Sequence, residues 1–203
     1  MMNGRSASRE IRSFIALEIS DEARSEIVRT IDRLKAEGAD VKWSRPDTLH
    51  ITLRFLGNIR SEQIQPVSKA IEDAASRGQE FDIVIGELGA FPGWDLPRVI
   101  WAGIADGADA AGDLARLIEG SLEKEGFPPE QRSFKAHLTI GRVMTPGNID
   151  RLKKAAMSSA LSPIRSHVRR IVLFKSELTP AGAVHTPIFS TELKTSENQT
   201  GCA

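Results

Sequence analysis

Two short stretches decide how this 203-residue chain folds: HITLRFLG at residues 50–57 and HLTIGR at residues 137–142. Both begin with the pattern His-apolar-Thr-apolar, and one stands in each half of the chain. Alternation of polar and apolar residues with period two is typical of a strand that buries one face. The sequence therefore predicts two equivalent strands in a chain with an internal repeat.

Period two also predicts which side chains share a face. His50 and Thr52 point to one side of the first strand, and His137 and Thr139 do the same on the second. Burial of the aliphatic residues then leaves an imidazole and a hydroxyl exposed together on each strand. Two such strands would form one symmetric site with two histidines and two threonines.

This set of groups suits acid–base chemistry at phosphorus. The unperturbed pKa of His is about 6.5, so one ring can accept a proton from an attacking hydroxyl while the other protonates the departing oxygen. Threonine hydroxyls can donate to the non-bridging phosphate oxygens. A single His-x-Thr strand is commonly only a half-exposed strand face, but two matched copies favour catalysis.

The composition limits the other classes of protein. The 27 Lys and Arg residues balance the 27 Asp and Glu residues, so a polyanion has to be bound locally rather than by overall charge. The single cysteine, Cys202, excludes a disulfide framework and a cysteine-rich zinc site. No long uncharged stretch is present, so we expect no membrane span and a cytoplasmic location.

A local positive charge accompanies the motifs. Arg132, Lys135 and Arg142 are three cations without an acid in residues 132–142, and Arg54 adds one beside the first motif. Arg142 lies one residue off the period of His137 and Thr139, so it reaches their face only if the strand bends or bulges near Gly141. An arginine there is well suited to a phosphate, because its planar fork binds two oxygens.

Several residues have a simpler interpretation. A metal site at the His pair is disfavoured, because no third ligand stands at strand or helix spacing and no carboxylate flanks either ring. His167 and His185 lack a threonine partner and are expected to be structural or surface residues. Phe55 is expected in the core rather than stacked on a base, while Trp43 and Trp101 are expected in the core or lining the site.

The rest of the chain predicts alternating short strands and helices. Ser20, followed by Asp21 and Glu22, indicates a helix start. A second helix is expected over residues 61–77, a third over 108–125, and a fourth capped by Asn148 that runs to about residue 160.

The motifs resemble the RNA 2′,3′-cyclic phosphodiesterase or 2′-5′ RNA ligase family of the two-histidine phosphoesterase superfamily. The likeness extends over roughly residues 12–193, including the approach KWSRP at residues 42–46 and the closing strands at residues 173–178 and 184–187. The polar residues 194–203 have no counterpart in the family pattern and are expected to be disordered.

The resemblance implies an α+β fold in a single bilobal domain, residues 1–193. Two similar lobes would carry antiparallel-type sheets that face each other across a central cleft, with helices on the outer faces.

The resemblance also implies an activity that needs neither metal nor ATP nor any other cofactor: hydrolysis of RNA 2′,3′-cyclic phosphate ends to 2′-phosphomonoesters. It makes His50 the proton donor and His137 the proton acceptor, with Thr52, Thr139 and Arg142 on the phosphate. The sequence symmetry itself does not decide which histidine is the acid. The candidate contacts to base or backbone are Phe55, Arg54, Arg132 and Lys135.

Two alternatives stay open at this point. The same site could perform 2′-5′ RNA ligation or cleave another 2′-5′ or cyclic nucleotide, or the protein could bind RNA ends without catalysis. The expected partner is an RNA with a cyclic phosphate end, and we expect a monomer without an obligate protein partner.

Overall fold

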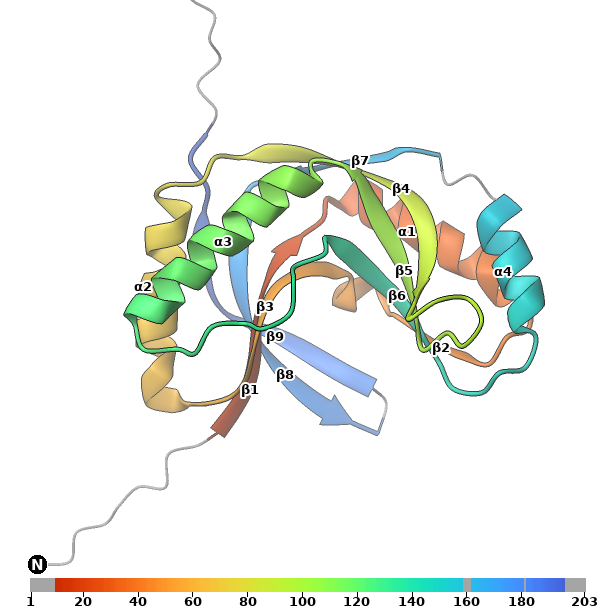
Figure 1. Cartoon of the computed structure of the whole chain (residues 1–203), viewed down its shortest axis with the longest axis horizontal. Coiled ribbons are helices and arrows are strands. Elements are labelled where there is room, and N and C mark those ends of the chain that lie inside the picture. The colour runs from red at the N-terminus through yellow and green to blue at the C-terminus, as the bar shows by residue number, and fades with distance from the viewer. Residues whose placement is uncertain (1–9, 159–161, 181, 196–203) are drawn as a thin grey trace, which may run out of the picture.

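The computed structural model describes residues 10–158, 162–180 and 182–195. It is an α+β fold in which a strongly curled antiparallel sheet carries helices on its outer side (Figure 1). The α+β class expected from the sequence is confirmed.

Helices and strands alternate along the chain, as the sequence predicts. The strands are β1 (Glu10–Glu18), β2 (Val41–Trp43), β3 (His50–Arg60), β4 (Phe81–Phe91), β5 (Val99–Asp106), β6 (His137–Val143), β7 (Ile164–Val168), β8 (Arg170–Thr179) and β9 (Gly182–Glu192). The helices are α1 (Asp21–Lys35), α2 (Ile64–Ala75), α3 (Ala108–Lys124) and α4 (Ile149–Ser158), with short 3-10 turns η1 (Pro46–Thr48) and η2 (Ser61–Gln63).

The strand order reflects the repeat in the sequence. The order is β7-β4-β5-β6-β3-β1-β8-β9, with β2 added beside β6, so the two motif strands β6 and β3 are adjacent at the centre. They are joined by the single pair Ile51↔Leu138. The two sheets expected from the resemblance are therefore halves of one continuous sheet, connected at the residues that follow the two histidines.

Each half of the sheet is covered by one helix from the first half of the sequence and one from the second half. α2 and α3 pack on each other and against β3, β8 and β9, whereas α1 and α4 pack on each other and against β7 and β4 (Figure 1). Each helix pair thus combines one helix from each half of the sequence. One apolar core lies between the sheet and both pairs, and it includes Ile31, Ile71, Ile118 and Leu152.

The predicted start of α1 is confirmed. The Ser20 side chain accepts a hydrogen bond from the Ala23 amide at 3.2 Å, and Asp21 and Glu22 occupy the first turn, where they interact favourably with the helix dipole. The apolar face Ile27 and Ile31 is buried. The N-terminal cap and the helical spacing of the apolar residues both favour a helix that begins at Asp21.

Asn148 directly precedes α4, where the sequence predicts the start of this helix, and its carbonyl accepts from the Leu152 amide at 3.1 Å. It adopts a φ of 58°, and its side-chain amide donates to the Gly38 carbonyl at 2.9 Å. The side chain therefore ties the start of α4 to the turn that follows α1. α4 is described to Ser158, and the predicted end near residue 160 lies outside the described residues.

The start of the expected tail is ordered. Lys194 forms a parallel bridge with Gln79, and its carbonyl accepts from the Glu80 amide at 2.8 Å. Residues 196–203, with Cys202, lie outside the described residues, so the expectation for them stays a prediction.

Candidate active site

The register at the centre of the sheet brings both motifs together. Ile51 and Leu138 face each other in an antiparallel pair and are fully buried. His50 and Thr139 flank that pair on one side along the strands, and Thr52 and His137 flank it on the other. All four side chains lie on the face opposite the buried aliphatics, as period two predicts.

Beyond each threonine, the register shifts by one residue. On β3, Thr52 lies opposite Ala16 but Arg54 lies opposite Ile15, so Leu53 is the extra residue. Such a bulge reverses the face of every later residue until the next shift. Arg54 therefore turns to the core side with Ile15, and Phe55 turns to the side of the motif.

The second motif contains the matching shift. On β6, Thr139 lies opposite Trp101 and Gly141 opposite Ile100, so Ile140 is the extra residue. Arg142 thereby joins the face of His137, as the sequence analysis required. Glycine is needed beside the shift, because a Cβ on Gly141 would lie 2.6 Å from Val41 Cγ1 on the adjacent β2.

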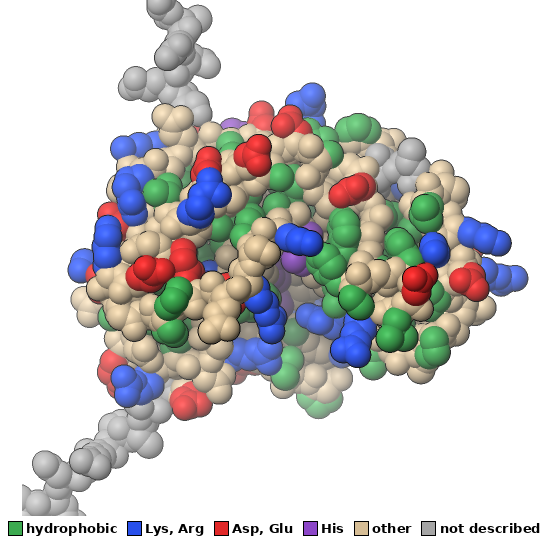
Figure 2. Space-filling view, in the orientation of Figure 1, with side chains coloured by type: hydrophobic (Ala, Val, Ile, Leu, Met, Phe, Trp, Pro, Cys, Tyr) green, Lys and Arg blue, Asp and Glu red, His purple; other side chains and the backbone are tan. Residues whose placement is uncertain are grey.

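One cavity of about 610 Å³, here called the cleft, contains the motif face. Figure 2 shows it as a central hollow with histidine at its base and Lys and Arg side chains around it. Six of the residues predicted for the site line it: His50, Thr52, Phe55, His137, Thr139 and Arg142.

Phe55 and Arg54 differ from the expected faces. The Phe55 side chain is 60% exposed, so its expected place in the core is wrong, and it is free to contact a ligand in the cleft. Arg54 is 9% exposed and binds Glu119 at 3.2 Å and Glu130 at 2.9 Å on the helix side of the sheet. The structure does not bring Arg54 into the cleft.

Arg132 and Lys135 are also exposed and outside the cleft lining. Lys135 instead contributes its backbone, because the His137 Nδ1 lies 2.7 Å from the Lys135 carbonyl oxygen. The His50 Nδ1 makes the same contact with the Thr48 carbonyl at 2.8 Å.

These two contacts fix the tautomer of both rings. A carbonyl oxygen only accepts, so Nδ1 must carry a proton in each ring. Nε2 is then the nitrogen that is left to accept a proton. The two histidines are held in the same way, two residues beyond the carbonyl that orients them.

Aromatic rings support the histidines from outside the motifs. Phe14 of β1 is buried and stacks on His50, with centroids 4.7 Å apart, and Phe91 of β4 meets His137 edge-on at 5.1 Å. The sequence does not predict Phe14 or Phe91 at the site, because these contacts depend on the strand order. Each ring is confined by a phenylalanine from a neighbouring part of the sheet.

His185 is a further site residue that the sequence does not predict. It lies on β9, lines the cleft, and contacts His50 edge-on at a centroid distance of 5.4 Å. It was expected to be structural or surface because it lacks a threonine. His167 does match that expectation, since it is exposed and pairs with Asp82 at 2.7 Å.

The environment of His50 disfavours its charged form. Burial and, to a lesser degree, the charge of His185 lower the pKa of His50 to about 4, against the opposing hydrogen bond to Thr48. Burial also lowers the pKa of His185. In the free protein the His50 ring is therefore neutral at pH 7, with an unprotonated Nε2.

This pKa shift predicts a pH-dependent stability. Between pH 6.5 and 4 the unfolded chain protonates His50 and the folded protein does not, so the free energy of unfolding falls as the pH falls. The loss attributable to this ring is roughly 3 kcal/mol below pH 4. Urea unfolding at several pH values should show a shallower decline for His50→Gln than for the wild-type protein. Parallel pH curves for the two proteins would contradict the shift.

The charge of the cleft has one sign. Among the described residues, its lining contains the cations Arg12, Lys42, Arg45 and Arg142 and no Asp or Glu. Opposite charges favour anions, and a low-dielectric hollow strengthens this effect. The local positive charge that the sequence predicted is therefore present, but three of these four cations come from outside residues 132–142.

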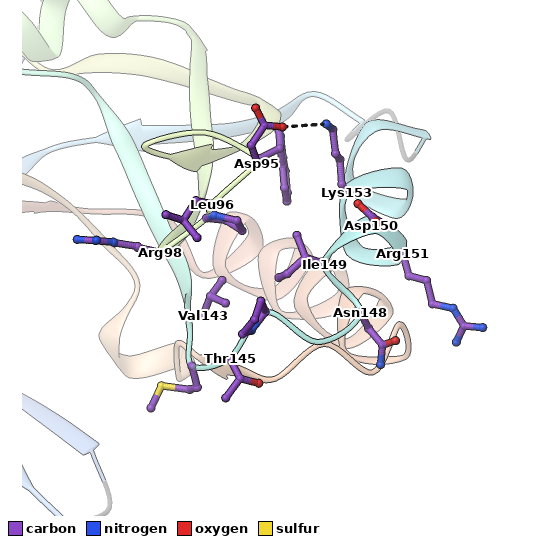
Figure 3. A pocket seen from close by; sticks show the side chains of 14 residues that line it. Asp95, Leu96, Arg98, Val143, Thr145, Asn148, Ile149, Asp150, Arg151 and Lys153 are labelled. Carbon is purple, nitrogen blue, oxygen red and sulfur yellow. Dashed lines mark ion pairs between the residues drawn. The ribbon is translucent and has the colours of Figure 1, made fainter.

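A larger cavity of about 800 Å³ lies between the β4–β5 connection and α4 (Figure 3). None of the predicted site residues lines it, and its charges are mixed, with Asp95 facing Lys153 at 3.9 Å. Within the described residues, no three His, Cys, Asp or Glu side chains gather as a metal-binding group. No described helix is both long and apolar enough to span a bilayer.

The LigT-like phosphoesterase family model matches residues 17–101 and 104–185. The RNA 2′,3′-cyclic phosphodiesterase of Methanothermobacter thermautotrophicus is 33% identical over 178 residues, which cover 87% of this chain and 96% of that protein. The Archaeoglobus fulgidus protein of the same name is also 33% identical, over 86% of this chain and 96% of its own length.

Solved structures show the same fold at lower identity. A Thermus thermophilus protein superposes with a TM-score of 0.76 at 24% identity, covering 92% of this chain and 100% of its own. Escherichia coli LigT in its apo form gives 0.72 at 21% identity, covering 92% and 99%. With the family model matched across both motifs, the chain belongs to the LigT-like phosphoesterases.

Proposed function

We propose that this protein hydrolyses RNA 2′,3′-cyclic phosphate ends to 2′-phosphomonoesters through acid–base catalysis by His50 and His137. The names of the relatives support the reaction. The observation that carries the proposal is the central pair Ile51↔Leu138, beside which the histidine and threonine of both motifs line one cationic cleft.

The reaction needs one proton removed and one delivered. In the proposed mechanism, water attacks phosphorus while its proton passes to Nε2 of His137, and a new P–O bond forms. The bond from phosphorus to the 3′ oxygen breaks, and His50 donates its Nε2 proton to that oxygen. The product is a 2′-phosphate beside a free 3′ hydroxyl, and solvent restores the two protonation states.

The phosphate itself is held by groups that do not titrate. Thr52 and Thr139 can donate hydroxyl hydrogen bonds to the non-bridging oxygens, and Arg142 can neutralise the charge. Since His50 is neutral in the free protein, it must take up its proton in the complex. The anionic phosphate favours this step, because a nearby negative charge raises the pKa of an imidazole.

The distribution of the catalytic groups suggests that one chain is sufficient. Both histidines and both threonines line a single cleft of one polypeptide. We therefore propose that a monomer acts on the RNA end without an obligate protein partner.

The test is incubation with an oligoribonucleotide that ends in a 2′,3′-cyclic phosphate, in EDTA and without ATP. We expect full turnover and a phosphorus NMR signal for the 2′-phosphate. A 3′-phosphate product would mean that the 2′ oxygen leaves. Activity that EDTA abolishes and a divalent metal restores would refute the metal-independent mechanism.

A further inference from the structure

The cations of the cleft outnumber what a single cyclic phosphate requires. Arg45 is already engaged, since it pairs with Asp47 at 2.9 Å and donates to the Ala183 carbonyl at 3.1 Å. For Arg12, Lys42 and Arg142, no carboxylate in the described part of the chain lies within ion-pair distance. A cyclic phosphate carries one negative charge, so it leaves two of these three cations without a counter-charge.

The position of Lys42 opposite Arg142 does not stabilise the folded protein. Lys42 of β2 lies directly opposite Arg142 of β6, where Cβ atoms are about 5 Å apart and like charges repel. Neither side chain is buried, and both line the cleft. Because folding gains nothing from this pair, its arrangement indicates an anionic ligand with more than one charge.

Lys42 and Arg12 approach the start of β9 from different elements. The Nζ of Lys42 is 3.7 Å from where a Cβ on Gly182 would lie, so the side chain reaches from β2 across to β9. Arg12 is exposed on β1, lines the same cleft, and its charge acts on His185 three residues further along β9. The two cations thus border one part of the cleft, beside the motif face.

We propose that Lys42 and Arg12 bind the phosphodiester on the 5′ side of the terminal nucleotide, so that the protein selects RNA ends over cyclic mononucleotides. This inference rests on the proposed function. Arg142 then serves the cyclic phosphate, and the neighbouring phosphate offsets the repulsion between Arg142 and Lys42. A free mononucleotide lacks that second phosphate and leaves the subsite unused.

The experiment compares substrates that differ by one nucleotide, and therefore by the phosphodiester that the proposed subsite would bind. A nucleoside 2′,3′-cyclic phosphate and the dinucleotide with the same cyclic end are turned over by wild-type protein, Lys42→Gln and Arg12→Gln. The matched control is Lys154→Gln, which removes one exposed charge from α4, outside the cleft. Affinity for the dinucleotide that ends in a 2′-phosphate is measured by calorimetry, which needs no turnover.

Lys42→Gln should lower kcat/KM for the dinucleotide, and we expect the fold-reduction for the dinucleotide to be about ten times the fold-reduction for the mononucleotide. This is the scale of one lost charge-assisted hydrogen bond. The plot of log kcat/KM against log salt for the dinucleotide should become shallower by about 0.7. Arg12→Gln should act in the same direction, and Lys154→Gln should leave kcat/KM unchanged for both substrates.

Equal losses on the two substrates, or no loss on either, would overturn the subsite. Failure of the proposed hydrolysis is a separate result. If the wild-type protein turns over neither substrate while Lys42→Gln still weakens binding of the dinucleotide 2′-phosphate about tenfold, the subsite stands and the reaction must be revised. If the wild-type protein turns over neither substrate and Lys42→Gln binds the dinucleotide 2′-phosphate as tightly as the wild-type protein does, both the subsite and the proposed reaction are contradicted.

Discussion

Replacing His137 with alanine is expected to slow the opening of an RNA 2′,3′-cyclic phosphate by at least about 100-fold in kcat, the usual effect of removing a general base. His50→Ala should have an effect of the same scale. Both rings line one cleft, and each has its Nδ1 proton held by a backbone carbonyl. The loss is therefore expected in the chemical step rather than in binding, and steady-state kinetics with a cyclic dinucleotide would measure it.

The two variants are distinguished by the leaving group. A substrate with sulfur in place of the bridging 3′ oxygen releases a thiolate, whose conjugate acid has a pKa near 8.5, so it needs little help from an acid. This substrate should restore most of the rate of His50→Ala and none of the rate of His137→Ala. The reverse pattern would exchange the roles of acid and base between the two rings.

The matched control is His167→Gln. His167 is exposed and pairs with Glu80 and Asp82 rather than lining the cleft, so its removal should leave turnover close to that of the wild-type protein. Near-wild-type rates in folded His50→Ala or His137→Ala would contradict two-histidine catalysis. Circular dichroism would confirm that these variants are folded.

The sequence predicted the central face of the site because that face depends only on period two. His50, Thr52, His137 and Thr139 fall on it as soon as Ile51 and Leu138 are buried. The prediction failed beyond Thr52, where a one-residue shift exchanges the faces of Arg54 and Phe55. On β6 the matching shift is marked by Gly141, and the position of Arg142 could be predicted from it.

The first shift carries no such mark, because the extra residue is Leu53 and no glycine stands beside it. The internal repeat contained the missing information. Phe55 and Arg142 each stand five residues after the motif histidine, so a bulge inferred at one site could have been transferred to the other. His185, Phe14 and Lys42 could not be found in this way, since they reach the cleft only through the pairing of β1, β8 and β9 and of β2 with β6.

Arg54→Ala is expected to lower the free energy of unfolding by about 3 kcal/mol, the effect of removing one partner from a buried ion pair. Arg54 bridges Glu119 on α3 and Glu130 in the following connection, and it also donates to the Pro128 carbonyl. The value lies at the lower end of the known range, because both carboxylates keep part of their contact with solvent. Urea unfolding measures the change.

Arg116→Ala is the control, since Arg116 forms an exposed pair with Asp113 on the same helix and such pairs contribute at most about 1 kcal/mol. The folded fraction of Arg54→Ala should keep its KM for a cyclic-ended dinucleotide, because the side chain lies on the helix side of the sheet. If Arg54→Ala instead has unchanged stability and a raised KM, Arg54 contacts the substrate. That result would mean that the shift at Leu53 is absent and that plain alternation holds along the whole of β3.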